Sequence, residues 1–212
     1  STLSPSSAAS DVYKRQEDLK ANLGADKIEY GEMLATSSAA GGLRMCVHGL
    51  VYDMTVKAAE AAALGAGAIV TMATAGKLSE YDIEDLKEAK PNLILLAGGT
   101  DYGEKETALF NARMIAASGV KAPVIYAGNV QNKRAVEDIF QKAGISCTVT
   151  ENVYPKLDKL NIEPARKIIH QVFEEHIIKA PGMEHIRDMV TGHIMPTPGA
   201  VMEAVQLSLI HI

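Results

Sequence analysis

The chain has 212 residues, of which 47% are hydrophobic, and it carries a formal net charge of −5. This length is enough for one large or two small domains with a sizeable core. An acidic chain without a basic run does not favour binding to nucleic-acid phosphates. No apolar stretch reaches the roughly 18 residues that span a bilayer. The sequence therefore predicts a globular protein of the cytosol, with neither a nucleic-acid nor a membrane partner.

The two ends of the chain differ from the rest. Residues 1–16 are rich in Ser, Ala and Pro and show no helical or strand periodicity. Residues 7–16 and 207–212 resemble translated adapter tails at the ends of assembled sequence fragments, and the chain does not begin with Met. We therefore expect residues 1–16 and 207–212 to be non-native tails, and the fold is predicted from residues 17–206.

Strand and helix patterns alternate between these ends. In chain order they predict strand 33–37, strand 43–50, helix 55–66, strand 68–73, helix 79–89, strand 92–97, helix 104–118, strand 123–127, helix 132–143 and strand 146–150. Strands separated by helices are typical of βαβ units with right-handed crossovers. Residues 17–150 are therefore predicted to form an α/β domain with a doubly wound, mostly parallel sheet.

Two helix starts carry residues that suit capping. Thr55 is predicted to be the N-cap of helix 55–66. Ser79 and Asp82 have the spacing of a capping box at the start of helix 79–89.

The pattern becomes helical after residue 150. Helices are predicted at residues 162–179 and 182–190 and from 200 to 206, with a loop at 195–199 and no further strand. Residues 151–206 are therefore predicted to form a helical segment.

The cysteines and histidines give little indication of special chemistry. Cys46 and Cys147 each lie in an apolar, strand-like run, which predicts buried, reduced thiols; a disulfide between them is the alternative. The histidines of the C-terminal part do not share the i, i+4 spacing of a metal site, so no metal site is predicted.

The most informative segment is the glycine-rich loop after strand 92–97. Gly98 and Gly99 allow a sharp turn, a positive φ or a close approach, and Thr100 and Asp101 add a hydroxyl and a carboxylate. A helix starting near residue 104 would direct unpaired N–H groups at this loop, which suits an anion. We therefore assign Gly98, Gly99, Thr100 and Asp101 to cofactor binding. The alternative is an ordinary strand-to-helix turn with Thr100 or Asp101 as N-cap.

Ordered blocks of sequence resemble one known family. They are ATSSAAGGLRM at 35–45, AAEAAALGAGA at 58–68, LILLAGGTD at 93–101, APVI at 122–125, TENV at 150–153, LNIEPAR at 160–166 and MPTP at 195–198. Together they are similar to the glutamate mutase accessory protein family, the actin-like ATPases called MutL in mutase operons. The likeness extends over nearly all of residues 17–206.

The resemblance implies a function that the local patterns do not show. Members of this family act as reactivating chaperones for adenosylcobalamin-dependent mutases, with ATP and Mg²⁺ bound as in actin and Hsp70. The chain would then be an interior piece of such an ATPase, with a mutase as its partner. The family's two Asp-x-Gly phosphate loops are not recognisable, and Tyr102 stands where the family usually has Gly, so this piece alone is expected to be inactive.

A second function remains open from the residues themselves. The chain could be a flavodoxin-like binding domain or enzyme that uses the Gly98-Gly99 loop for a small phosphate-bearing ligand.

Overall fold

A computed structural model describes residues 43–178 without a break, and outside them residues 21–22, 35–37, 188, 190–192, 194–197, 200–201 and 204–205. The chain divides into two compact units. One comprises residues 1–37 and 174–195, and the other comprises residues 38–173 and 196–212. The second unit contains the main sheet.

This sheet has five strands, all parallel, in the order β3-β2-β4-β5-β6. The strands are β2 (Arg44–Gly49), β3 (Ile69–Ala75), β4 (Leu93–Leu96), β5 (Val124–Tyr126) and β6 (Cys147–Val149). The chain starts at β2, moves outward to β3, crosses back to β4 and continues to β5 and β6. The predicted doubly wound α/β fold is confirmed, with the strand order of flavodoxin-like sheets.

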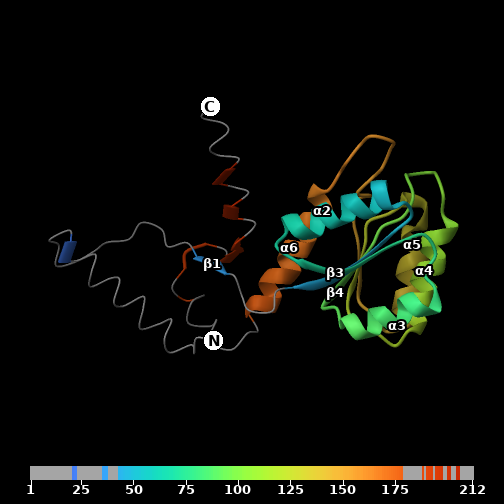
Figure 1. Ribbon diagram of the computed structural model, residues 1–212, viewed down its shortest axis with the longest axis horizontal. Coiled ribbons are helices and arrows are strands. Elements are labelled where there is room, and N and C mark those ends of the chain that lie inside the picture. Colours follow the sequence, from blue (N-terminus) through green and yellow to red (C-terminus); the bar gives the residue numbers. More distant parts are fainter. Residues whose placement is uncertain are drawn as a thin grey trace. The chain divides into compact units, whose positions relative to one another are not determined.

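Helices cover both faces of the sheet (Figure 1). They are α2 (Lys57–Gly65), α3 (Glu80–Ala89), α4 (Glu106–Ala117), α5 (Lys133–Lys142) and α6 (Glu163–Ile178). Helices α2 and α6 lie on one face, and α3, α4 and α5 lie on the other (Figure 1). Ala165, Ile169 and Phe173 of α6 are buried, so the compact unit extends well beyond the last strand.

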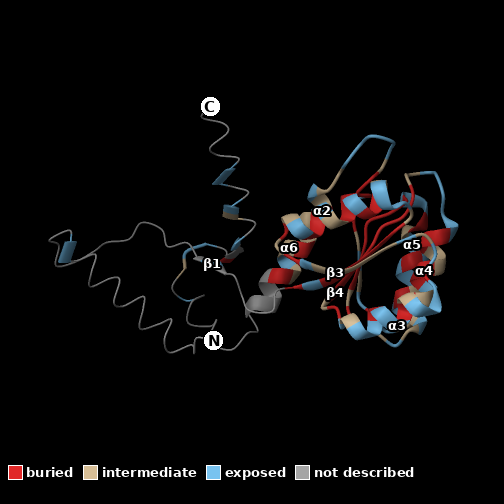
Figure 2. Ribbon diagram, viewed as in Figure 1, coloured by how far each residue is buried: buried red, intermediate tan, exposed pale blue. Residues whose placement is uncertain are grey.

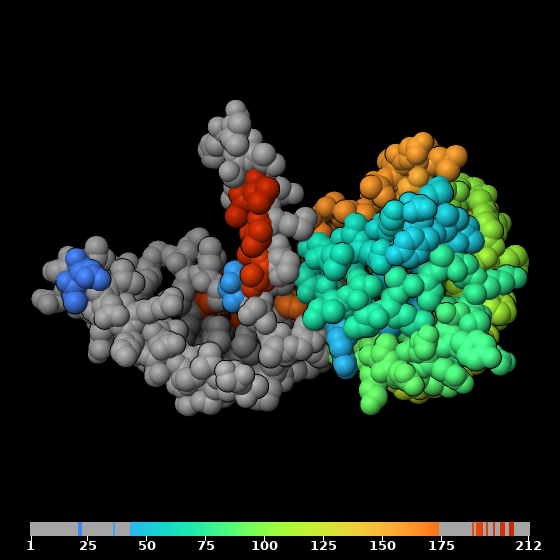
Figure 3. All heavy atoms as spheres, in the orientation of Figure 1, coloured from blue at the N-terminus to red at the C-terminus, as the bar shows by residue number. Residues whose placement is uncertain are grey.

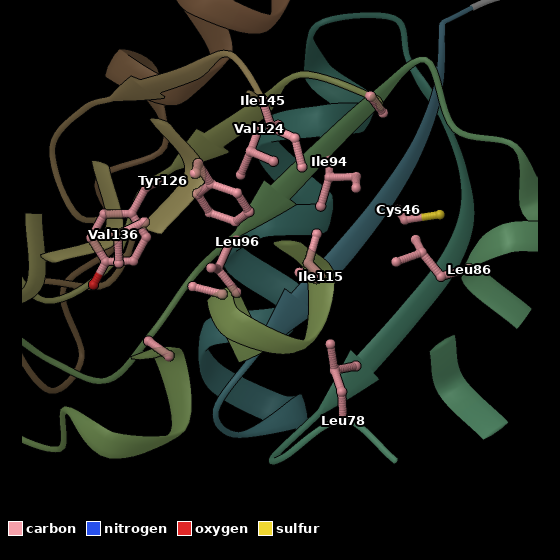
Figure 4. Close-up of a cluster of buried hydrophobic side chains, with 14 of the residues drawn as sticks. Cys46, Leu78, Leu86, Ile94, Leu96, Ile115, Val124, Tyr126, Val136 and Ile145 are labelled. Atoms are coloured by element: carbon pink, nitrogen blue, oxygen red, sulfur yellow. The ribbon is translucent and has the colours of Figure 1, made fainter. Parts of the chain in front are cut away.

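The central strands of the sheet contribute residues to the hydrophobic core. All four residues of β4 are buried, as expected for a strand covered on both faces (Figure 2). On the side of α3, α4 and α5, Cys46, Ile94, Leu96, Val124 and Tyr126 pack against Leu86, Ile115, Val136 and Ile145 (Figure 4).

Strand β3 contains one irregularity. Met45 pairs with Val70 and Cys46 pairs with Met72, so Thr71 is an extra residue in β3. The Thr71 hydroxyl donates to the Met45 carbonyl oxygen at 3.1 Å, which fixes this β-bulge.

The predicted capping box of Ser79 and Asp82 is confirmed, whereas the predicted N-cap role of Thr55 is wrong. The Ser79 hydroxyl accepts from the Asp82 N–H at 3.2 Å, and Asp82 Oδ2 accepts from the Ser79 N–H at 2.7 Å. Thr55 instead lies inside a π-helical turn, Tyr52–Val56, that precedes α2. Its hydroxyl accepts from the N–H groups of Leu50 and Val51, so it binds the backbone before it and does not cap α2.

The C-terminal prediction needs one correction. A strand, β7 (Ile194–Pro196), forms where a loop and no strand were predicted, and it pairs with β1 (Ala35–Ser37). A partner so distant in the sequence leaves no local signal. Residues 200–201 and 204–205 are helical as predicted, whereas most of the helix predicted at 182–190 lies outside the described residues.

Within the described part of the chain, no helix is both long and apolar enough to cross a membrane.

Both cysteines are free, but they differ in burial. Cys46 is fully buried, as predicted, whereas Cys147 is only half-buried because it lies on the edge strand β6. Strands β4 and β5 separate them, a distance of about 14 Å at 4.8 Å per strand, which excludes the alternative of a disulfide.

We expect slow thiol labelling in the native protein. Burial raises the pKa of Cys46, and it raises the pKa of Cys147 to about 11, with a smaller effect of Glu137. The reactive thiolate is therefore scarce at pH 8. Labelling with a disulfide reagent should be slow for Cys147, slower still for Cys46, and fast for both in denaturant. Fast labelling of native Cys46 would contradict its place in the core.

Candidate functional site

The loops that follow β2, β4, β5 and β6 gather at one end of the sheet (Figure 1). The order of the strands reverses between β2 and β4. In open α/β sheets, ligands bind outside the carboxyl ends of the strands near such a reversal. This carboxyl edge is therefore the candidate site.

The four predicted site residues lie here, but the two glycines face the protein itself. Gly98 and Gly99 are buried, and neither has a positive φ. A Cβ on Gly98 would lie 3.2 Å from Ala108 Cβ, and a Cβ on Gly99 would lie 3.0 Å from the Glu104 carbonyl oxygen. The close approach that requires glycine is thus an approach of the chain's own helix α4 and loop. The positive φ belongs to Tyr102 instead, at 63°.

The alternative role of Thr100 or Asp101 as an N-cap is wrong. Helix α4 begins at Glu106, and its N-cap position, Lys105, makes no side-chain capping bond. An N–H group in the first turn of α4 is instead satisfied by Glu104: its Oε1 accepts a hydrogen bond from the Thr107 N–H at 2.8 Å. The glycine-rich loop is therefore longer than a simple strand-to-helix turn.

Asp101 joins three loops. Its Oδ1 accepts from the Val130 N–H at 2.9 Å and from Asn152 Nδ2 at 3.0 Å. Its own N–H donates to the Pro155 carbonyl oxygen at 3.0 Å. Asn152 also donates to the Gly99 carbonyl oxygen at 2.9 Å. The loops after β4, β5 and β6 are thereby held together.

Asn129 is the second connection between these loops, and its role was not predicted from the sequence. It is fully buried, its Oδ1 accepts from the N–H groups of Tyr102 and Gln131, and its Nδ2 donates to the carbonyl oxygens of Gly103 and Glu104. Beneath it, the Tyr126 hydroxyl donates to the Asn129 carbonyl oxygen at 3.0 Å. Burial raises the pKa of Tyr126, which keeps this hydroxyl protonated as a donor.

The donors of the loop decide how well it suits a phosphate. An anion cradle needs several free N–H groups directed at one point. The N–H groups of Asp101, Tyr102 and Gly103 donate to Pro155, Asn129 and Thr100 respectively. The N–H groups of residues 101–103 are therefore not free to bind a phosphate in this conformation, and the assignment of Gly98, Gly99, Thr100 and Asp101 to cofactor binding stays a prediction.

The other acidic residues near the strand ends are engaged elsewhere. Asp53 forms an exposed ion pair with Lys57 at 2.7 Å, and Glu151 accepts from Asn161 Nδ2 at 3.0 Å. No group of three or more His, Cys, Asp or Glu side chains in the described ranges is placed to bind a metal ion.

One buried polar group lies just below this edge. His48, near the end of β2, is fully buried, and its Nδ1 lies 2.7 Å from Thr74 Oγ1. Its Nε2 has no hydrogen-bond partner among the described residues. Burial lowers the pKa of His48 to about 4, with a smaller opposing effect of the Asp82 charge, so the imidazole is neutral at pH 7.

Gly128 permits the closest contact between two of these loops. A Cβ there would lie 2.7 Å from the Gly98 nitrogen and 2.8 Å from the Tyr126 hydroxyl oxygen. We expect Gly128→Ala to lower the free energy of unfolding by about 3 kcal/mol, because backbone must move to relieve the overlap. Urea unfolding followed by circular dichroism would measure it.

Gly76→Ala is the matched control. Gly76 has a φ of +83° but no atom within 4 Å of an added Cβ, so only conformational strain of about 1 kcal/mol is expected. Equal effects of the two substitutions would show that the packing between the loops is not tight.

The strand order, the helices on both faces and the hydrogen-bonded carboxyl-edge loops define a doubly wound α/β domain. The chain matches the family described as MutL protein over residues 1–209. Protein MutL of Clostridium tetanomorphum is 46% identical over 194 residues, which are 92% of this chain and 42% of that protein. The chain belongs to the MutL protein family and spans less than half the length of this relative.

A solved structure shows a weaker similarity. The crystal structure of the sugar isomerase domain of the RpiR transcription factor from Sphaerobacter thermophilus has a TM-score of 0.36 and 12% sequence identity, and the match covers 69% of this chain and 77% of that one. A likeness at this level supports no inference about function.

Proposed function

We propose that this chain is part of an accessory protein for an adenosylcobalamin-dependent mutase of the glutamate mutase type. The observation that carries the proposal is membership of the MutL family, with 46% identity to Protein MutL of Clostridium tetanomorphum. In the intact protein we further propose an actin-like ATPase that uses ATP and Mg²⁺ to reactivate the mutase. The free thiols of Cys46 and Cys147 suit the reducing cytosol, where we place it.

The partner is tested by co-purification. Tagged chain and purified glutamate mutase should elute together from a size-exclusion column, whereas an unrelated cobalamin-independent mutase should not bind. In the full-length protein, ATP should accelerate the exchange of damaged cobalamin on the mutase. Absence of both effects would refute the accessory role.

We expect no ATP turnover by this chain alone. Phosphoryl transfer needs Mg²⁺ and donors held around the γ-phosphate by several loops. The amides of residues 101–103 are engaged within the protein, which favours the same result. A phosphate-release assay with Mg²⁺ should give the rate of a buffer blank. Turnover that Asp101→Ala abolishes would show a complete site inside this chain.

The flavodoxin-like strand order supports a second candidate, a small-molecule binding domain. Its ligand would lie near the reversal between β2 and β4. Calorimetric titration of the chain with ATP and with a sugar phosphate tests it: tight binding that Asp101→Ala removes would favour this function over the accessory role.

A further inference from the structure

We draw no further inference here: the strongest candidate, the surface patch of exposed apolar side chains in the loops at the carboxyl edge of the sheet, where the loop after β6 projects as the orange segment of Figure 3, supports none because these loops also hold Asp53, Asp101 and Glu151 and nothing in the structure shows what covers the patch.

Discussion

Asn129→Ala is expected to lower the free energy of unfolding by about 3–5 kcal/mol, because it removes both ends of a fully buried amide. Two backbone N–H groups and two carbonyl oxygens, in the segments 102–104 and 131, lose their partner together. Each buried polar group left unpaired costs about 1–3 kcal/mol, reduced where water can enter. Urea unfolding at pH 7 measures the loss.

Asn92→Ala is the matched control for this experiment. Asn92 makes one comparable bond, in which its Oδ1 accepts from the N–H of Arg44 at 3.0 Å near the surface. A loss of about 1 kcal/mol is expected there. If Asn129→Ala were no more harmful than Asn92→Ala, the carboxyl-edge loops would not depend on Asn129.

His48 is expected to make the stability depend on pH between about 6.5 and 4. The folded state lowers the pKa of His48 from 6.5 to about 4, so in this range the unfolded chain binds more protons. Stability is therefore fully present above pH 6.5 and is lost as the pH falls towards 4, by roughly 3 kcal/mol in total. Unfolding curves at half-unit pH intervals would show this slope.

Two variants distinguish the contribution of His48 to this pH dependence from that of other titrating groups. His48→Leu should remove most of the slope, whereas Thr74→Val, which removes the hydroxyl near Nδ1 but keeps the imidazole, should retain it. A slope unchanged in His48→Leu would mean that another group is responsible.

Local patterns were sufficient for most of the architecture. The βαβ alternation predicted all five strands of the parallel sheet, and Ser79 with Asp82 predicted a helix start because both partners lie within one turn. Thr55 shows the limit of such reasoning. A threonine hydroxyl can bind N–H groups on either side of it, and the sequence does not say that Thr55 binds those of Leu50 and Val51.

The hydrogen bonds that Asn129 and Asn152 make between the carboxyl-edge loops could not be predicted from the sequence, for a related reason. Asn129 and Asn152 bind residues 25 to 53 positions away, and such contacts depend on which strands are neighbours. One signal was available: each asparagine comes shortly after a predicted strand, and the carboxyl ends of parallel strands share an edge. Gly98 and Gly99 were predicted to approach a ligand, whereas the atoms that lie close to them in the structure belong to the protein itself.

The β-bulge at Thr71 has a consequence for solubility. Strand β3 is an outer strand of seven residues without a charged side chain, and such a strand can serve as a template for intermolecular sheet growth. The opposite outer strand, β6, has only three residues and offers little length for pairing. The extra residue in β3 breaks the regular spacing of its outward N–H and C=O groups, so that another extended chain cannot pair along its whole length. The bulge thus protects against aggregation at the place where the sheet lacks the usual lysine or proline.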